Sequence, residues 1–210
     1  MNRTTTLLSS LLLASALLVP GAGRAQPKPT AAQLELLNTQ EKEMLAVAQD
    51  FGRRSAEAME AWLAAKEVSE ERLFSFFYYP VPQTDPPKFT TDWDRLSVRD
   101  IQGVEEAVLS RAQGLVFAVL VDRYGYLPTH NLRYSQPLTG NLANDLVNNR
   151  TKRIFNDKTG IAAARSAAPF LIQRYQRDTG ETMVDLSVPV FVRGMHWGAV
   201  RLGFRAIDAR

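Results

Sequence analysis

Residues 115–160 read LVFAVLVDRYGYLPTHNLRYSQPLTGNLANDLVNNRTKRIFNDKTG, and the fold of the rest of the chain can be worked out from this stretch. The run from Leu115 to Val121 is apolar throughout, which is typical of a central strand buried on both faces. The chain then turns at a glycine, and we expect Tyr126 to Thr129 to form a short strand beside the first. His130 follows directly, so one of the two histidines of the protein lies where the chain leaves the sheet.

Three further strands are predicted downstream of this stretch. They span Phe170 to Arg177, Thr182 to Val192 and His196 to Arg205. The first two are joined by Asp178-Thr179-Gly180-Glu181, a typical hairpin turn in which glycine supplies a positive φ. Sequential hairpins leave no room for helical crossovers, so we predict an antiparallel sheet of about five strands in an α+β domain.

A long helix is predicted upstream of the sheet, over residues 31–67. Thr30 and Gln33 fit a capping box at its start. From Leu34 to Ala65, positions at alternating steps of three and four form one largely apolar face, and the helix would be about 55 Å long. Two arrangements stay open: the helix packs along its own domain, or it pairs with the same helix of a second copy in a homodimer.

Residues 69–113 are predicted to contain short helices and a proline-rich loop. Ser69 is the expected cap of a short helix over Glu70 to Phe76. Four prolines follow between Pro80 and Asp94, which indicates an ordered loop that wraps the surface. Leu96, Ile101, Val104, Ala107 and Val108 indicate a further helix that ends near Gly114. We expect residues 26–210 to form a single domain, with its sheet region at 115–205.

The first 25 residues have the composition of a secretory signal peptide. Arg3 precedes an apolar core from Leu7 to Val19, and small residues at Gly23 and Ala25 favour cleavage after Ala25. That core is too short to cross a bilayer, which needs about 20 apolar residues. We therefore expect a periplasmic or secreted protein.

Composition argues against several classes of function. Loss of Arg3 and Arg24 with the signal peptide leaves 23 basic and 22 acidic residues, and such a nearly neutral domain is a poor nucleic-acid binder. The chain has no cysteine, which excludes a thiol nucleophile and covalent haem attachment, and its two histidines lack clustered carboxylates for zinc. Asp178-Thr179-Gly180 lacks the apolar flank and second loop of an aspartic protease. We do not expect an enzyme.

Two basic residues in the opening stretch are candidates for binding an anion. We predict a helix from Asn144 to Phe155, capped by Asn141 or Asn144, on which Arg150 and Arg153 project on the same side. They form either a solvated basic face or a clamp for a carboxylate, whose geometry guanidinium groups match.

His130 also has two interpretations. It either locks its own loop by donating to a backbone carbonyl, or contacts a ligand. The full set of residues predicted to form and close a ligand pocket is Tyr126, His130, Asn131, Arg150, Arg153, Tyr175 and Trp197. As an alternative, His130 is the axial ligand of haem b in an apolar slot formed by Phe155, Tyr175 and Trp197.

Several sequence blocks resemble a known family of sensor domains. The blocks are GYLPTHN at 125–131, NRTKRIFNDKTG at 149–160, RDTGE at 177–181, HWGAVRLGF at 196–204 and PVPQTDPPKF at 80–89. Together they resemble the extracellular Cache, or PAS-like, sensor domains of bacterial methyl-accepting chemotaxis proteins, over most of residues 70–205. The resemblance implies a long N-terminal helix on a PAS-like antiparallel sheet, with a small-molecule pocket between the sheet and its covering loops.

The resemblance also implies a role in signal transduction and chemotaxis, with a small polar or anionic metabolite as the ligand. Chemoreceptors carry transmembrane helices around the sensor and a cytoplasmic signalling coiled coil, whereas this sequence has neither. We therefore expect a free-standing exported domain that acts through a partner, such as a membrane-bound receptor or kinase. A third hypothesis is an interaction module that binds no ligand and docks a receptor through the long helix.

Overall fold

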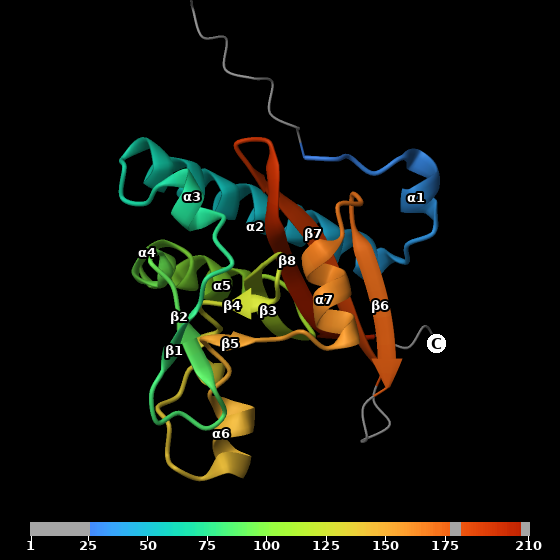
Figure 1. The fold of residues 1–210 in the computed structure, drawn as a ribbon. Coiled ribbons are helices and arrows are strands. Elements are labelled where there is room, and N and C mark those ends of the chain that lie inside the picture. Colours follow the sequence, from blue (N-terminus) through green and yellow to red (C-terminus); the bar gives the residue numbers. More distant parts are fainter. Residues whose placement is uncertain (1–25, 177–181, 207–210) are drawn as a thin grey trace, which may run out of the picture.

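The protein has an α+β fold built on a four-stranded antiparallel sheet (Figure 1). The computed structural model describes residues 26–176 and 182–206. The strand order is β3-β8-β7-β6, with bounds β3 (Leu115–Asp122), β8 (Met195–Arg205), β7 (Thr182–Val192) and β6 (Leu171–Gln176). The signal peptide predicted at 1–25 and the turn predicted at 178–181 lie outside the described residues.

Helices cover both faces of this sheet. In Figure 1, α2 (Thr39–Ala64) crosses behind β7 and β8, and α7 (Lys158–Arg165) lies in front of them. Among the described residues, no helix is long and apolar enough to span a membrane.

Strand register assigns side chains to the two faces. Ala118, Leu120 and their cross-strand partners Leu202 and Val200 point toward α2 and belong to the main hydrophobic core. The opposite face, here called the cavity face, carries alternate residues, because successive side chains of a strand point to opposite sides. Val119 of β3 pairs there with Arg201 of β8.

The remaining elements are short and surround the sheet. They are α1 (Ala31–Glu35), α3 (Glu70–Leu73), β1 (Tyr79–Val81), β2 (Lys88–Thr90), α4 (Asp94–Asp100), α5 (Gln102–Leu109), β4 (Tyr126–Leu127), η1 (Leu132–Tyr134), α6 (Leu142–Asn148) and β5 (Arg153–Ile154). Ser69 caps α3 as predicted, with its side chain accepting from the N–H of Arg72.

The long helix is interrupted, which corrects the prediction of one helix over 31–67. The predicted capping box of Thr30 starts only α1, and a second box starts α2: the Asn38 side chain accepts from Glu41 N at 2.8 Å, and Glu41 accepts from Asn38 N at 3.1 Å. The apolar period continues across the break, but Leu36 between the helices is 82% exposed. Glu41 lies buried in the apolar face because it caps α2 and pairs with Arg174 of β6.

Two predictions for the stretch after β3 are also corrected. The strand at Tyr126 pairs with β5 and not with β3. The helix predicted from Asn144 to Phe155 is only α6, capped by Asn141, after which the chain runs through a left-handed residue at Lys152. Backbone hydrogen bonds explain the change, because Arg150 N donates to Tyr134 O at 2.7 Å and Lys152 N donates to Leu127 O at 2.7 Å.

Strand β3 lies at the edge of the sheet and not at its centre, and side chains satisfy its free edge. Its outward N–H groups at Ala118 and Leu120 donate to Asn131 Oδ1 at 2.8 Å and to Glu105 Oε1 at 3.1 Å. Asn131 Nδ2 donates in turn to the backbone oxygen of Glu105 at 3.0 Å, and Thr129 donates to Glu105 Oε1 at 3.1 Å. The segment after β4 is therefore fixed to both β3 and α5.

Glu105 is an acidic group with unusual surroundings. Its side chain is fully buried, and its Oε2 has no hydrogen bond within the described part of the chain. Burial raises the pKa of Glu105 from 4.5 to about 8, against the smaller effect of its hydrogen bonds from Leu120 and Thr129. When the pKa of a carboxyl group is higher in the folded state than in the unfolded state, the fold loses stability as the pH rises and the group ionises.

We predict that Glu105→Gln stabilises the protein relative to the wild type increasingly as the pH rises from about 5 to about 8. The wild type loses roughly 1.4 kcal/mol per pH unit there, because the folded state holds a proton that the unfolded state has released. The amide cannot ionise, so this loss disappears. Urea denaturation of both proteins at pH 5.5 and pH 8 measures the difference.

The control variant is Glu43→Gln, which changes an exposed residue of α2 in the same way. Its stability should follow the wild type at both pH values. A Glu105→Gln protein with the same pH dependence as the wild type would contradict the buried, protonated state of Glu105.

Candidate functional site

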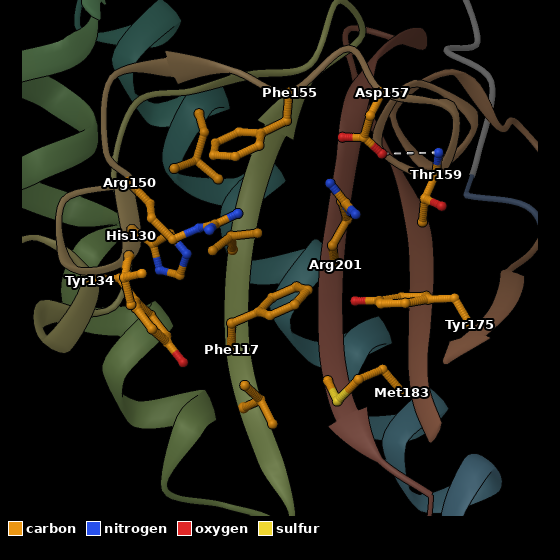
Figure 2. A pocket seen from close by; sticks show the side chains of 14 residues that line it. Phe117, His130, Tyr134, Arg150, Phe155, Asp157, Thr159, Tyr175, Met183 and Arg201 are labelled. Carbon is orange, nitrogen blue, oxygen red and sulfur yellow. Dashed lines mark hydrogen bonds between the residues drawn. The ribbon is translucent and has the colours of Figure 1, made fainter. Parts of the chain in front are cut away.

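A cavity of about 560 Å³ lies between the cavity face of the sheet and the segment from β4 to the start of α7. Figure 2 shows His130, Tyr134 and Arg150 on one side, Tyr175 and Met183 on the other, and Phe117 and Arg201 on the strands between them. The lining residues are Val116, Phe117, Val119, Leu127, His130, Tyr134, Val147, Arg150, Phe155, Asp157, Thr159, Tyr175, Met183 and Arg201.

Three of the seven residues predicted to form the pocket line this cavity: His130, Arg150 and Tyr175. They come from three separate parts of the chain, namely the segment after β4, the segment after α6, and β6. The structure therefore brings together an imidazole, a guanidinium group and a phenol that the sequence places up to 45 residues apart.

Trp197 and Tyr126 do not line the cavity. Trp197 is buried in the main core on the α2 side of the sheet, where its indole Nε1 donates to Leu73 O at 3.0 Å. The Tyr126 ring belongs to the same core, and its hydroxyl donates to Asp94 at 2.9 Å. Strand alternation alone would put Trp197 on the cavity face with Ala199 and Arg201. The β7–β8 register shifts between the Val190–Gly198 and Phe191–His196 pairs and leaves Trp197 without a cross-strand partner, so alternation is interrupted at this residue.

Asn131 and Arg153 also lie outside the cavity lining. Asn131 is fully buried and bonds to the edge of β3, as described above. Arg153 belongs to β5, where its Nη1 donates to Leu146 O at 3.3 Å and its guanidinium lies 5.1 Å from the Phe155 ring centroid. Arg150 and Arg153 both contact this ring, but only Arg150 faces the cavity.

His130 is buried and held in one orientation. Its Nδ1 accepts from the backbone N–H of Asn131 at 2.7 Å. The ring therefore fixes its own loop, but as a hydrogen-bond acceptor and not as the donor to a carbonyl that was predicted. Its backbone oxygen accepts from Gln102 Nε2 at 3.2 Å and from Ser135 Oγ at 2.9 Å. Because Nδ1 is an acceptor, the neutral ring carries its proton on Nε2.

The imidazole of His130 remains uncharged in this environment. Burial, with a smaller effect from the positive charges of Arg150, Arg133 and Arg201, lowers its pKa from 6.5 to about 3. The ring packs against Tyr134, with 4.7 Å between the ring centroids and an angle of 58° between the ring planes. His130 therefore presents a neutral N–H donor at neutral pH, and not a positive charge.

Arg150 is the unusual cation of the site. Burial lowers the pKa of its guanidinium, and its ring contact at 5.0 Å with Phe155 supplies only a cation–π interaction. Within residues 26–176 and 182–206, Arg150 forms no salt bridge and its side chain makes no hydrogen bond. Arg150 is partly buried. Removing a guanidinium from water without a salt-bridge partner is costly, and one anion in the cavity would reduce that cost.

Arg201 contrasts with Arg150 because it has an acidic partner. Its Nη2 lies 2.6 Å from Asp185 Oδ2, and its Nε lies 3.4 Å from Oδ1. Asp185 is fully buried, and burial raises its pKa while the neighbouring Arg201 opposes that rise. The pair forms part of the cavity face with no net charge.

Other lining residues were not predicted from the sequence, although some left a signal there. Arg201 and Asp185 are charged residues inside otherwise apolar strands, and period-two alternation places both on the cavity face. Gly203 leaves room beside them for the Phe117 ring, since a Cβ at this glycine would lie 2.1 Å from the ring. Asp157 caps α7 by accepting from the N–H groups of Thr159 and Gly160. No sequence pattern indicated that it lines a pocket.

Haem b fits these surroundings only in part. His130 supplies an imidazole on the cavity wall, as an axial ligand would require. The haem b hypothesis needed an apolar slot, but the walls also carry the charged residues Arg150, Arg201 and Asp157. The residues that surround the cavity fit a small anion better than a macrocycle.

No protein-family model and no curated protein matches the chain.

We predict that Arg201→Gln destabilises the protein by about 3–5 kcal/mol, because it leaves the buried Asp185 carboxylate without its cation. The double variant Asp185→Asn/Arg201→Gln should recover much of this loss, since it leaves no buried charge. Denaturant unfolding of the three proteins measures both effects.

The control is Arg53→Gln, which removes an exposed arginine paired with Asp50 and Glu57 on α2. It should change stability little, because solvent screens surface pairs. An Arg201→Gln protein as stable as this control would contradict the prediction, because it would show that the fold tolerates Asp185 without the positive charge of Arg201.

Proposed function

We propose that the protein is a small-molecule-binding sensor domain whose ligand carries an anionic group that binds Arg150. The observation that carries the proposal is a partly buried guanidinium that forms no salt bridge among the described residues and faces a cavity of about 560 Å³. Cavities of about 300–1,000 Å³ are typical of small-molecule sites. Guanidinium groups are well suited to carboxylates, which they bind through paired hydrogen bonds.

The neighbouring His130 supports an anionic ligand as well. Its Nε2–H has no hydrogen-bond partner within the described part of the chain, and its pKa of about 3 keeps the ring neutral. A neutral donor beside a cation stabilises a bound carboxylate and adds no second charge to an empty site. The two groups together would hold one anion from one side of the cavity.

The cavity is connected to the helices through the segment that carries His130. Asn131, the next residue, bonds both to β3 and to the backbone of Glu105 on α5. Helix α5 contacts α2 as well as β3. A ligand that moved His130 would therefore act on α5 and α2 through contiguous hydrogen bonds and packing, which is a route by which a sensor could alter a partner contact.

This proposal agrees with the resemblance to Cache sensor domains of chemotaxis receptors. On that basis we propose that the domain acts in signal transduction from the periplasm or outside the cell, through a membrane-bound receptor or kinase. A homodimer through the long helix remains part of the same hypothesis. We propose no catalytic role and no nucleic-acid partner.

We predict that Arg150→Gln weakens binding of an anionic ligand by about tenfold or more, because it removes a charge-assisted hydrogen bond. The ligand is to be found by thermal-shift screening of organic acids against the protein lacking residues 1–25, and its affinity is then measured by calorimetry.

The matched control is Arg153→Gln, three residues along, which changes an arginine that contacts the same Phe155 ring but does not line the cavity. It should retain affinity within a factor of about three. If Arg150→Gln is folded and binds as well as this control, or if no acid in a broad set stabilises the wild type, the proposal fails.

The alternative function is a haem b-binding redox or gas sensor, which the position of His130 on the cavity wall favours. It predicts a Soret absorption band in protein purified from haem-replete cells, and loss of that band in His130→Ala. His196→Ala is the control, since His196 does not line the cavity. Colourless wild-type protein that does not take up added haem would dismiss this alternative.

A further inference from the structure

We infer that the ligand is a monocarboxylate with an apolar body, aromatic or branched, and neither a dicarboxylate nor an amino acid. The inference rests on the proposed function, because it takes Arg150 as the anion-binding group. It is carried by the balance of charges around the cavity and by the chemistry of the rest of the lining.

The charges on the cavity walls leave a place for one anion only. Arg201 is paired with Asp185, so it offers no net charge to a ligand. Arg150 is then the one cation of the lining that forms no salt bridge among the described residues, although the charge of Asp157 also acts on it. Asp157 adds a carboxylate at the start of α7. A second carboxylate on the ligand would lack a cation and would be repelled by Asp157.

An amino acid does not suit the site for a related reason. Its ammonium group is attached to the carbon next to its carboxylate, so the two groups cannot bind opposite walls. With the carboxylate at Arg150, the ammonium would lie beside a guanidinium and the Nε2–H of His130, both of which are donors. Asp157 Oδ1 already accepts from the N–H groups of Thr159 at 3.1 Å and Gly160 at 3.0 Å, so that only its Oδ2 is left to accept from an ammonium group.

The lining also has an apolar part, some of which is aromatic. Half of the fourteen lining residues have hydrocarbon or thioether side chains, and Tyr134 and Tyr175 add two phenol rings: the apolar residues are Val116, Phe117, Val119, Leu127, Val147, Phe155 and Met183. Burial of apolar ligand surface against such walls is favourable, and aromatic walls suit an aromatic ligand in edge-to-face contact.

The size of the cavity points to the same class. A carboxylate with one or two carbons would fill little of the 560 Å³ and would leave the apolar side chains of the lining in contact with water. The ring of Phe117 lies across Gly203 and therefore does not fill the space. A six-carbon ring or a branched chain behind the carboxylate would occupy it.

Calorimetry with the wild-type protein and five matched compounds tests the inference. The reference compound is 3-phenylpropionate. Propionate removes its ring, 3-phenylpropionamide removes its charge, phenylsuccinate adds a second carboxylate, and L-phenylalanine adds an ammonium group. We expect 3-phenylpropionate to bind most tightly and each of the other four to bind about tenfold or more weakly. In Arg150→Gln, the affinities of the acid and the amide should become similar.

The outcomes separate this inference from the proposed function. If phenylsuccinate, L-phenylalanine or propionate binds as tightly as 3-phenylpropionate, and Arg150→Gln weakens that binding, the ligand class is wrong and the anion site stands. If the amide binds as tightly as the acid, both the ligand class and the anion site are wrong. If none of the five binds while an unrelated acid binds through Arg150, only the ligand class is overturned.

Discussion

The free edge of β3 is the constraint on which the site depends. An edge strand exposes backbone N–H groups that need acceptors, and two of them here are satisfied by the side chains of Asn131 and Glu105. Because Asn131 is the residue after His130, this bond fixes the imidazole next to the sheet. The same bonds bring α5 against β3. The edge of β3 therefore contacts both the segment that forms one wall of the cavity and the helix α5, which packs against α2.

The two faces of the sheet have different chemistry for a physical reason. The face under α2 is apolar, and its large residues pack into the main core. The cavity face carries Arg201 and Asp185, whose burial is tolerated because they neutralise each other. Arg150 has no such compensation in the described chain, and it is the difference between these two arginines that gives the cavity its expected preference for one negative charge.

Sequence patterns predicted the sheet better than the segments that cover it. Period-two alternation and turn residues located β6, β7 and β8 closely, and the α+β class with a long helix packed on the sheet is confirmed. The break at Asn38 was missed because the apolar period runs through it, and the helix predicted to contain Arg150 was wrong because backbone bonds to Tyr134 and Leu127 compete with helical ones. The candidate site was found in part: His130 and Arg150 lie in a polar stretch that attracted attention, whereas Arg201 could only be placed by strand parity.

Gly203 affects the shape of the cavity through the Phe117 ring, although Gly203 is not one of the lining residues. The missing side chain lets the Phe117 ring lie flat over the neighbouring strand, where any Cβ would meet it at 2.1 Å. A single methyl group at this position would displace the Phe117 ring, which lines the cavity, and would change the space beside it. The shape of the cavity can therefore diverge through a residue that does not line it, while His130 and Arg150 stay unchanged.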